Sequence, residues 1–236
     1  MKFYRNDAIE DRAGQRISEM EVILGKPLEP PISLDLIAEQ ILGLDILWEA
    51  IEELPGEVIY GGLRMEDKLI VLNERQRALF EQKPGLERST KGHEMGHWDL
   101  FGKSNQAGQL RLFEDDEAFV RRSSPAGDLL VIKALIQTPE GQELLRQINK
   151  RADDPDEARA VNRYAAALSM PKRLITEEAM KINRRSWPPL YRLAEQFEVS
   201  ITALTVRLQQ LNLLYIDDQK RLYESREQAT GQGSLF

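Results

Sequence analysis

The histidines of the stretch 90–102, Thr-Lys-Gly-His-Glu-Met-Gly-His-Trp-Asp-Leu-Phe-Gly, constrain this chain more than any other residues. His93 and His97 are the only two histidines among 236 residues, and they stand four positions apart with Glu94 directly after the first. On an α-helix this spacing puts both imidazoles on one face, one turn apart, where two ring nitrogens can converge on a single cation. The stretch therefore predicts a helix that carries a metal site of the His-Glu-x-x-His kind.

Each residue of this motif has a chemical role in the prediction. Neutral imidazole is a good ligand for Zn²⁺, and two imidazoles leave room for a third protein ligand and a water, whose pKa the bound metal lowers towards neutrality. Glu94 follows His93 by about 100° of helix, so its carboxylate can take a proton from that water instead of binding the metal. We therefore expect a Zn²⁺ cofactor with Glu94 as general base, although manganese or iron also suits two histidines and a carboxylate.

The composition excludes several other classes of protein. The chain has no cysteine, which removes disulfides, thiolate zinc ligands and cysteine nucleophiles. The amino terminus runs straight into charged residues, and no apolar run approaches the roughly 18 residues that a membrane span needs. We therefore expect a cytoplasmic protein that does not contact a membrane. A formal charge of -7 argues against a large nucleic-acid surface but allows a local basic patch.

The hydrophobic periodicity predicts an α+β fold that is mostly helical. Amphipathic helices are expected from Asp7 to Leu24 and from Ser33 to Leu42, each followed by a glycine. Three segments have the composition of strands: 44–48, 57–65 and 68–73. The last two are expected to form a hairpin or to be two neighbouring strands. The metal helix is expected at 86–101, after Pro84-Gly85. We expect a small three-stranded sheet packed on a zincin-like metal helix.

Beyond the metal helix, a polar segment from Gly102 to Gly127 is expected to be an irregular loop with an acidic run at 114–117. Helices are expected after it at 128–137, at 139–150 and from Pro155 to just before Met170. Two histidines make an incomplete zinc site, so a carboxylate must come from elsewhere. The candidates are Glu157, on the last of these helices, and the acidic run.

Three blocks follow one another along this sequence: Arg88-Ser-Thr-x-x-His-Glu-Met-Gly-His-Trp98, Glu157-Ala-Arg-Ala-Val-Asn-Arg-Tyr-Ala-Ala-Ala-Leu-Ser-Met-Pro171, and the segment from Trp187 to Leu208. Together they resemble the ImmA/IrrE family of zinc metallopeptidases. The resemblance extends from Ser33 to Asp217 with the blocks in the same order. It is therefore more specific than the zinc motif alone.

The resemblance implies a zinc endopeptidase that cleaves a regulatory protein, such as a helix-turn-helix repressor, and thereby induces mobile-element or stress genes. In the family the third ligand is a glutamate four residues before the Asn of the Asn-x-Phe-Ala helix. That position is Ala158 in this chain, and Glu157 lies one residue earlier, which is about 100° of helix. Glu157 is still the expected third ligand beside the two histidines, with Asp156 or Asp154 next.

Peptide hydrolysis also needs a donor for the tetrahedral oxyanion. Tyr164, Arg163 and Arg122 have suitable chemistry, and nothing in the sequence selects one of them, although Tyr164 is the candidate we name first. The alternative to a peptidase is a non-catalytic module that uses the metal fold to hold a repressor or DNA. Glu94 separates the two hypotheses, because a peptidase needs this carboxylate and a binding module can lose it.

The carboxy-terminal third is expected to be a helix-turn-helix-like segment. A short helix at 171–181 precedes a helical pair at 190–197 and 201–211, the second helix capped by Ser200. Residues 171–211 contain seven Lys or Arg against four Glu, and the last helix contributes only Arg207. This modest excess allows DNA binding, but we expect the pair to pack on the peptidase domain instead.

The end of the chain is expected to be a disordered tail with a short linear motif. Gln232-Gly-Ser-Leu-Phe236 puts two apolar side chains at the tip of a polar segment. It resembles the bacterial sliding-clamp binding peptide, as does Gln109-Leu-Arg-Leu-Phe113, so Gln232, Leu235 and Phe236 are candidate clamp contacts. The expected organisation is an N-terminal helical arm (1–32), a zinc metallopeptidase-like domain (33–170), the helix-turn-helix-like segment (171–217) and the tail (218–236).

Overall fold

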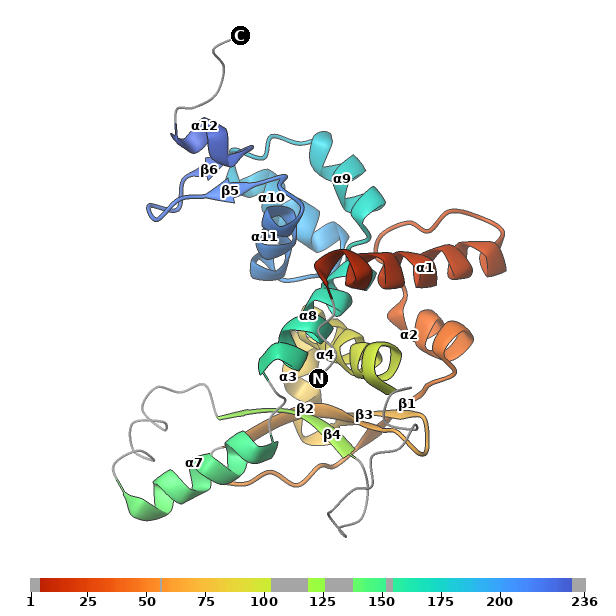
Figure 1. Ribbon diagram of the computed structural model, residues 1–236, viewed down its shortest axis with the longest axis vertical. Helices are drawn as coiled ribbons and strands as arrows, with labels where there is room; N and C mark the ends of the chain where they lie inside the picture. The colour runs from red at the N-terminus through yellow and green to blue at the C-terminus, as the bar shows by residue number, and fades with distance from the viewer. Residues whose placement is uncertain (1–4, 56, 103–118, 126–137, 152–154, 231–236) are drawn as a thin grey trace.

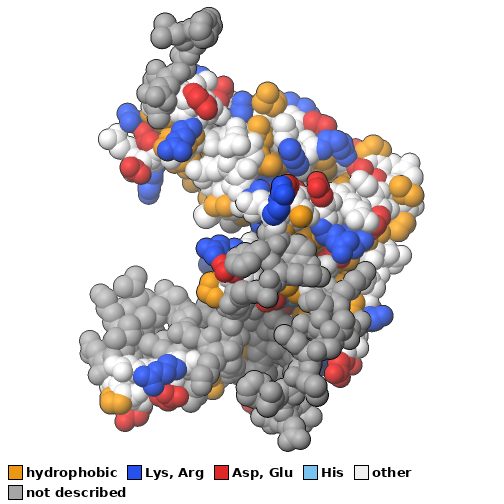
Figure 2. Space-filling view, in the orientation of Figure 1, with side chains coloured by type: hydrophobic (Ala, Val, Ile, Leu, Met, Phe, Trp, Pro, Cys, Tyr) orange, Lys and Arg blue, Asp and Glu red, His pale blue; other side chains and the backbone are white. Residues whose placement is uncertain are grey.

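The computed structural model describes residues 5–55, 57–102, 119–125, 138–151 and 155–230. Figure 1 shows a small sheet at one end of the molecule, crossing helices in the middle and a helical segment at the other end. On the face drawn in Figure 2, acidic and basic side chains are interspersed over the helical parts. No helix within the described ranges is long and apolar enough to cross a membrane.

The helix α1 (Asn6–Leu24) belongs to the core and is not a separate arm. It lies across α8 (Pro155–Ser169) in the middle of the molecule and ends where Gly25 adopts a left-handed conformation, with φ 64°. Glycine takes this conformation without the steric penalty of a Cβ atom. The buried side chains of α1 recur at helical spacing and are Ile9, Ala13, Ile17 and Met20.

The mixed sheet has four strands in the order β1-β3-β2-β4. They are β1 (Asp45–Glu49), β2 (Glu57–Arg64), β3 (Leu69–Asn73) and β4 (Phe119–Pro125). The first three confirm the predicted strands, with β2 and β3 antiparallel as expected for a hairpin and β1 parallel to β3. The fourth strand pairs with β2 and lies in the segment expected to be an irregular loop. Strands pair through backbone hydrogen bonds, so this strand could not be predicted from the spacing of apolar residues.

The metal helix lies between the sheet and α8 (Figure 1). It begins as α4 (Pro84–Gly96) and continues as the π-helical segment η3 (His97–Gly102), so the predicted helix is confirmed but its change of winding was not foreseen. Shorter elements complete this half of the molecule: α2 (Leu34–Ile37), η1 (Ala38–Leu42), η2 (Glu74–Gln76), α3 (Arg77–Gln82) and α7 (Pro139–Arg151). The helix expected at 128–137 and the acidic run at 114–117 lie outside the described residues.

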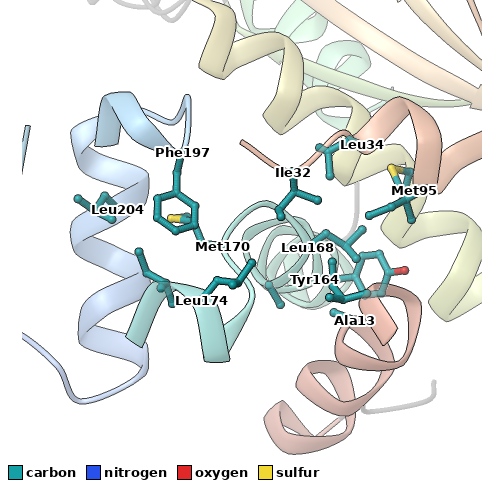
Figure 3. Packing of buried hydrophobic residues seen from close by; sticks show 14 of the residues in the cluster. Ala13, Ile32, Leu34, Met95, Tyr164, Leu168, Met170, Leu174, Phe197 and Leu204 are labelled. Carbon is teal, nitrogen blue, oxygen red and sulfur yellow. The ribbon is translucent and has the colours of Figure 1, made fainter. Parts of the chain in front are cut away.

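The predicted helix-turn-helix-like pair is present and shares the core of the rest of the molecule. It consists of α10 (Trp187–Gln196) and α11 (Ile201–Gln210), preceded by α9 (Lys172–Met180), and the Ser200 side chain accepts a hydrogen bond from the Ala203 N–H as expected of a cap. Figure 3 shows side chains of these helices meeting Met170 at the end of α8. The buried cluster continues from there to α1 and α4. The segment is therefore packed, through α8, against the part of the molecule that contains α1 and α4.

The disorder predicted from residue 218 onward is wrong for residues up to 230. A two-stranded ribbon, β5 (Tyr215–Ile216) with β6 (Leu222–Tyr223), and the short helix α12 (Arg226–Thr230) occupy this region. Asp217 accepts hydrogen bonds from two backbone N–H groups of the connecting turn. The polar residues of this region thus form a turn in which a side chain binds the backbone, and they do not indicate disorder. The candidate clamp contacts Gln232, Leu235 and Phe236 lie outside the described residues, as does the second clamp-like stretch at 109–113.

Candidate metal site and its supporting contacts

Two glycines allow α8 to approach the metal helix closely. A Cβ atom at Gly92 would lie 2.9 Å from the Ala165 Cβ, and one at Gly96 would lie 2.9 Å from the Val161 Cβ. These glycines are four residues apart, so they lie on one face of α4. Because they carry no side chain, α8 comes near enough for its own side chains to reach the histidines. The Gly-x-x-x-Gly spacing inside the metal motif was the available sequence signal, and it was missed.

The two histidines converge through their Nε2 atoms, which lie 3.1 Å apart. Each Nδ1 atom faces an oxygen of α8, namely Asn162 Oδ1 at 2.9 Å from His93 and Glu157 Oε1 at 3.0 Å from His97. An imidazole whose Nδ1–H donates to oxygen carries its lone pair on Nε2. These partners therefore turn two lone pairs towards each other. Such an arrangement could hold a cation between the two Nε2 atoms.

Glu94 is fully buried beside this pair, and the exposed fractions of His93 and His97 are 3% and 1%. A buried carboxylate is costly in free energy unless positive charge or hydrogen bonds stabilise it. The predicted helical geometry thus brings the three motif residues into one buried region.

Glu157 reaches the site on the far side of the His97 ring from the converging Nε2 atoms. The α8 helix runs without interruption from Pro155, so no bulge compensates for the one-residue offset from the family position. Within the ranges the structure describes, no three His, Asp or Glu side chains are grouped so as to hold a metal ion. Of the alternatives, Asp156 pairs with Arg159, and Asp154 lies outside the described residues. In this geometry the carboxylate of Glu157 orients His97.

Asn162 was not among the predicted site residues, yet it contacts His93 directly. It lies five residues after Glu157 on the same helix. Since α4 and α8 run side by side, one residue of α8 serves each histidine. The available signal was that this asparagine belongs to the sequence block that resembles the peptidase family.

Tyr164, the expected oxyanion donor, is directed towards another group. Its side chain is fully buried and its hydroxyl donates to Asp99 Oδ2 over 2.7 Å. Burial and the neighbouring Asp99 carboxylate raise the pKa of Tyr164 far above its ordinary value, so the hydroxyl stays protonated and donates a hydrogen bond to Asp99. The expected role is not compatible with this arrangement. Of the other candidates, Arg163 forms an ion pair with Glu10 at 3.1 Å, and the Arg122 side chain lies outside the described part.

The close contact of Gly92 and Gly96 with α8 predicts the effect of a substitution on the stability of the protein. Replacing Gly96 by alanine is expected to lower the free energy of unfolding by about 1–3 kcal/mol, because the new Cβ overlaps Val161 and forces the helices apart. Urea denaturation followed by circular dichroism measures the change. The matched control is Gly14→Ala on α1, where a Cβ would meet nothing within 4 Å and where alanine is expected to stabilise the helix by about 0.5–1 kcal/mol. Equal effects of the two substitutions would contradict the close contact.

Comparisons with known proteins give little further information. No family model matches the chain, and no curated protein matches it. A solved structure described as a Mycobacterium tuberculosis transcriptional regulator is similar with a TM-score of 0.44 and 13% sequence identity, over 93% of this chain and 56% of that one. This chain therefore spans little more than half of that neighbour. A likeness at this level bears on neither family nor function.

Proposed function

We propose that the chain is a zinc-dependent endopeptidase, similar to the ImmA/IrrE enzymes, that cleaves a regulatory protein such as a helix-turn-helix repressor. The observation that carries the proposal is the pair of His93 and His97 Nε2 atoms, 3.1 Å apart, with an oxygen acceptor on each Nδ1. Metal-ligating histidines almost always donate their other ring N–H to a carboxylate, a carbonyl or a water. The contacts to Asn162 and Glu157 follow this pattern.

The donor set fits Zn²⁺, with His93 and His97 as the ligands. When bound, zinc supplies Lewis-acid activation of a water molecule and of a peptide carbonyl. The role of third ligand for Glu157 stays a prediction, because it requires the carboxylate to leave Nδ1 of His97 and to reach the Nε2 side. In the observed position Glu157 fixes the His97 tautomer, and Asn162 does the same for His93.

Glu94 is the residue that would move the proton. It follows His93 directly on α4, and its carboxylate is buried away from bulk water. As general base it would accept a proton from the attacking water, and as general acid it would return that proton to the leaving amine. The side chain therefore has to remain uncoordinated to the metal while it acts.

A second function, a non-catalytic module that binds a repressor through the same fold, is favoured by one observation. Glu157 is held at Nδ1 of His97, and the described residues do not assemble three metal ligands. Direct DNA reading by α11 has less support, because Arg207 is fully buried. The exposed side chains of this helix are uncharged: Thr202, Val206 and Gln209. Tethering to the sliding clamp through Gln232, Leu235 and Phe236 stays a separate prediction.

Metal content and cleavage of a repressor encoded beside the gene test the proposal together. We expect about one zinc ion per wild-type chain and almost none in His97→Ala. Asn162→Ala is expected to bind zinc about 10–100-fold more weakly, because His93 loses the partner that sets its tautomer. Elemental analysis and chelator competition measure these values, and gel electrophoresis follows the repressor. Folded wild-type protein that holds no metal, leaves the repressor intact and still binds it would establish the non-catalytic module instead.

A further inference from the structure

The π-helical segment η3 begins at His97, the second predicted metal ligand. A π-helix has i→i+5 hydrogen bonds and usually appears as a single turn inside an α-helix, frequently at functional sites. Local sequence propensity does not maintain such a turn, so contacts from the surrounding structure have to hold it. The orientation of His97 relative to His93 depends on where the winding changes. The contacts that hold η3 therefore also set the orientation of His97 relative to His93.

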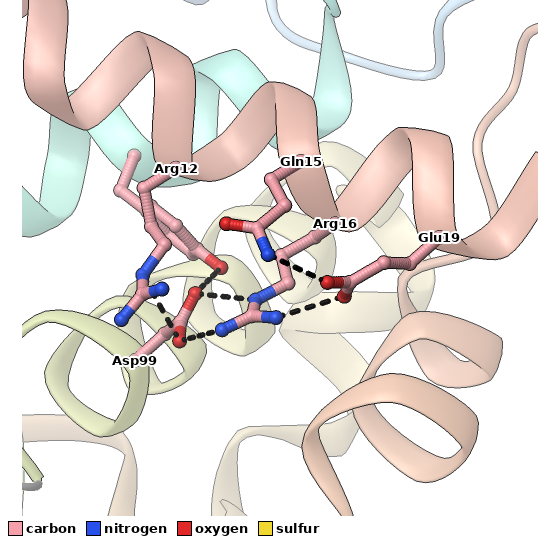
Figure 4. Close-up of polar contacts among 6 residues, drawn as sticks. Arg12, Gln15, Arg16, Glu19 and Asp99 are labelled. Carbon is pink, nitrogen blue, oxygen red and sulfur yellow. Dashed lines mark hydrogen bonds and ion pairs between the residues drawn. The ribbon is translucent and has the colours of Figure 1, made fainter.

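Asp99 is the side chain of this segment that α1 and α8 both contact. It lies two residues after His97, and its side chain is 3% exposed. Figure 4 shows its carboxylate beneath α1, where Arg16 donates from Nη2 to Oδ1 over 2.7 Å and from Nε to Oδ2 over 2.9 Å. Tyr164 of α8 donates to Oδ2 over 2.7 Å, and Arg12 lies 3.5 Å from Oδ1. Three elements thus meet at one carboxylate.

Arg16 is itself held in place, so the contact is a rigid one. Its side chain is 12% exposed, and its remaining terminal nitrogen, Nη1, donates to Glu19 over 2.8 Å. A guanidinium that binds a carboxylate through two parallel hydrogen bonds fixes orientation as well as distance. No lysine could reproduce this fork, because an ammonium is a point charge.

We propose that Arg16 and Asp99 are positioning residues for His97, through which α1 holds the π-helical turn in the orientation that metal binding requires. The inference rests on the proposed metal site. It gives α1 a function beyond core packing, since this helix fixes η3 from one side while α8 fixes both histidine rings from the other. Neither Arg16 nor Asp99 touches the metal or the substrate in this role.

The affinity for Zn²⁺, measured by chelator competition, tests the proposal. Asp99→Asn keeps the shape of the side chain but removes its charge, and Arg16→Gln removes the fork. In both variants the dissociation constant is expected to rise about 10–100-fold, as is typical when groups that orient metal ligands are lost. The dissociation constant of Arg16→Lys is expected to lie between the value of the wild type and the values of these two variants. Gln15→Ala is the matched control, because this exposed neighbour on α1 bonds only to Glu19 among the contacts described.

Two further measurements separate positioning from simple stabilisation. The visible spectrum of the Co²⁺-loaded protein is expected to change in Asp99→Asn and not in Gln15→Ala. In the metal-free protein, the amides of residues 97–102 are expected to exchange faster in Arg16→Gln while those of α11 do not. Lower thermal stability with an unchanged Zn²⁺ affinity and an unchanged Co²⁺ spectrum overturns the inference alone. A folded wild type that takes up neither metal overturns the proposed function and the inference with it.

Discussion

Replacing Glu94 by glutamine is expected to lower the rate of repressor cleavage by about 10³-fold while the zinc content stays at the wild-type value. Glutamine has nearly the same size as glutamate but cannot accept a proton at neutral pH. Since the proposal assigns the metal to His93 and His97, loss of this carboxylate leaves the ligands in place. The measurement is kcat/KM for the repressor, with both proteins brought to the same zinc occupancy.

The matched control for this substitution is Glu87→Gln. Glu87 lies in the first turn of the same helix, where its side chain is 30% exposed and forms an ion pair with Lys91 at 2.7 Å. Its loss is expected to change kcat/KM by less than about twofold, because Lys91 keeps its second carboxylate partner, Asp35, and because Glu87 lies six residues, or nearly two helical turns, before His93. Wild-type cleavage by Glu94→Gln would remove Glu94 from the mechanism. Loss of zinc in that variant would instead make it a ligand.

Replacing Glu10 by alanine is expected to lower the free energy of unfolding by about 3–5 kcal/mol, since it leaves the charge of Arg207 buried without its partner. Arg207 is fully buried, and its Nη1 and Nη2 atoms donate to the two Glu10 oxygens over 2.6 and 2.8 Å. Its Nε donates to the Met170 carbonyl over 3.0 Å. Urea denaturation at neutral pH measures the loss.

A double substitution and a surface control sharpen this experiment. Glu10→Ala combined with Arg207→Met removes both charges, so it is expected to cost less than Glu10→Ala alone. Asp7→Ala breaks an exposed pair between the first turn of α1 and Arg5, the residue that precedes this helix, and is expected to cost less than about 1 kcal/mol. A Glu10→Ala variant as stable as Asp7→Ala would show that Arg207 does not depend on Glu10.

The same ion pair predicts a dependence on pH. Burial raises the pKa of Glu10, but the hydrogen bonds and charges of Arg207 and Arg163 outweigh it, and the pKa lies below its ordinary value of 4.5. Because the folded state has the lower pKa, the stabilisation is complete above that ordinary value and is lost as the pH falls through the folded value. Wild-type stability is therefore expected to fall more steeply than that of Glu10→Ala between about pH 5 and pH 3.

The burial of Arg207 also bears on the helix-turn-helix-like pair. The arginine that the sequence offered as the one long basic side chain of α11 binds α1 and the end of α8 instead of facing outward. The pair is thus joined to α1 by an ion pair, and to α1, α4 and α8 by the shared hydrophobic cluster. This arrangement agrees with the expectation that the pair packs on the part of the molecule that contains α4 and α8.

Local patterns in the sequence determined most of the elements. The spacing of apolar residues predicted α1 and the hairpin of β2 and β3, and Ser33 and Ser200 marked the starts of two helices. The four-residue spacing of His93 and His97 predicted that both rings share one face of a helix. These predictions succeed because helix periodicity, strand alternation and capping depend on residues a few positions apart.

The tertiary structure alone decided what each of these side chains meets. The α8 partners of the two histidines lie 60 and 69 residues away from them in the sequence. Arg16 lies 83 residues from Asp99, and Glu10 lies 197 residues from Arg207. Which oxygen faces which ring nitrogen depends on how closely α8 approaches Gly92 and Gly96, and on the winding change at His97. Backbone pairing likewise made β4 a strand without any hydrophobic pattern. Spacing along the chain fixes which residues share a face of a helix, whereas long-range packing fixes the atoms that this face contacts.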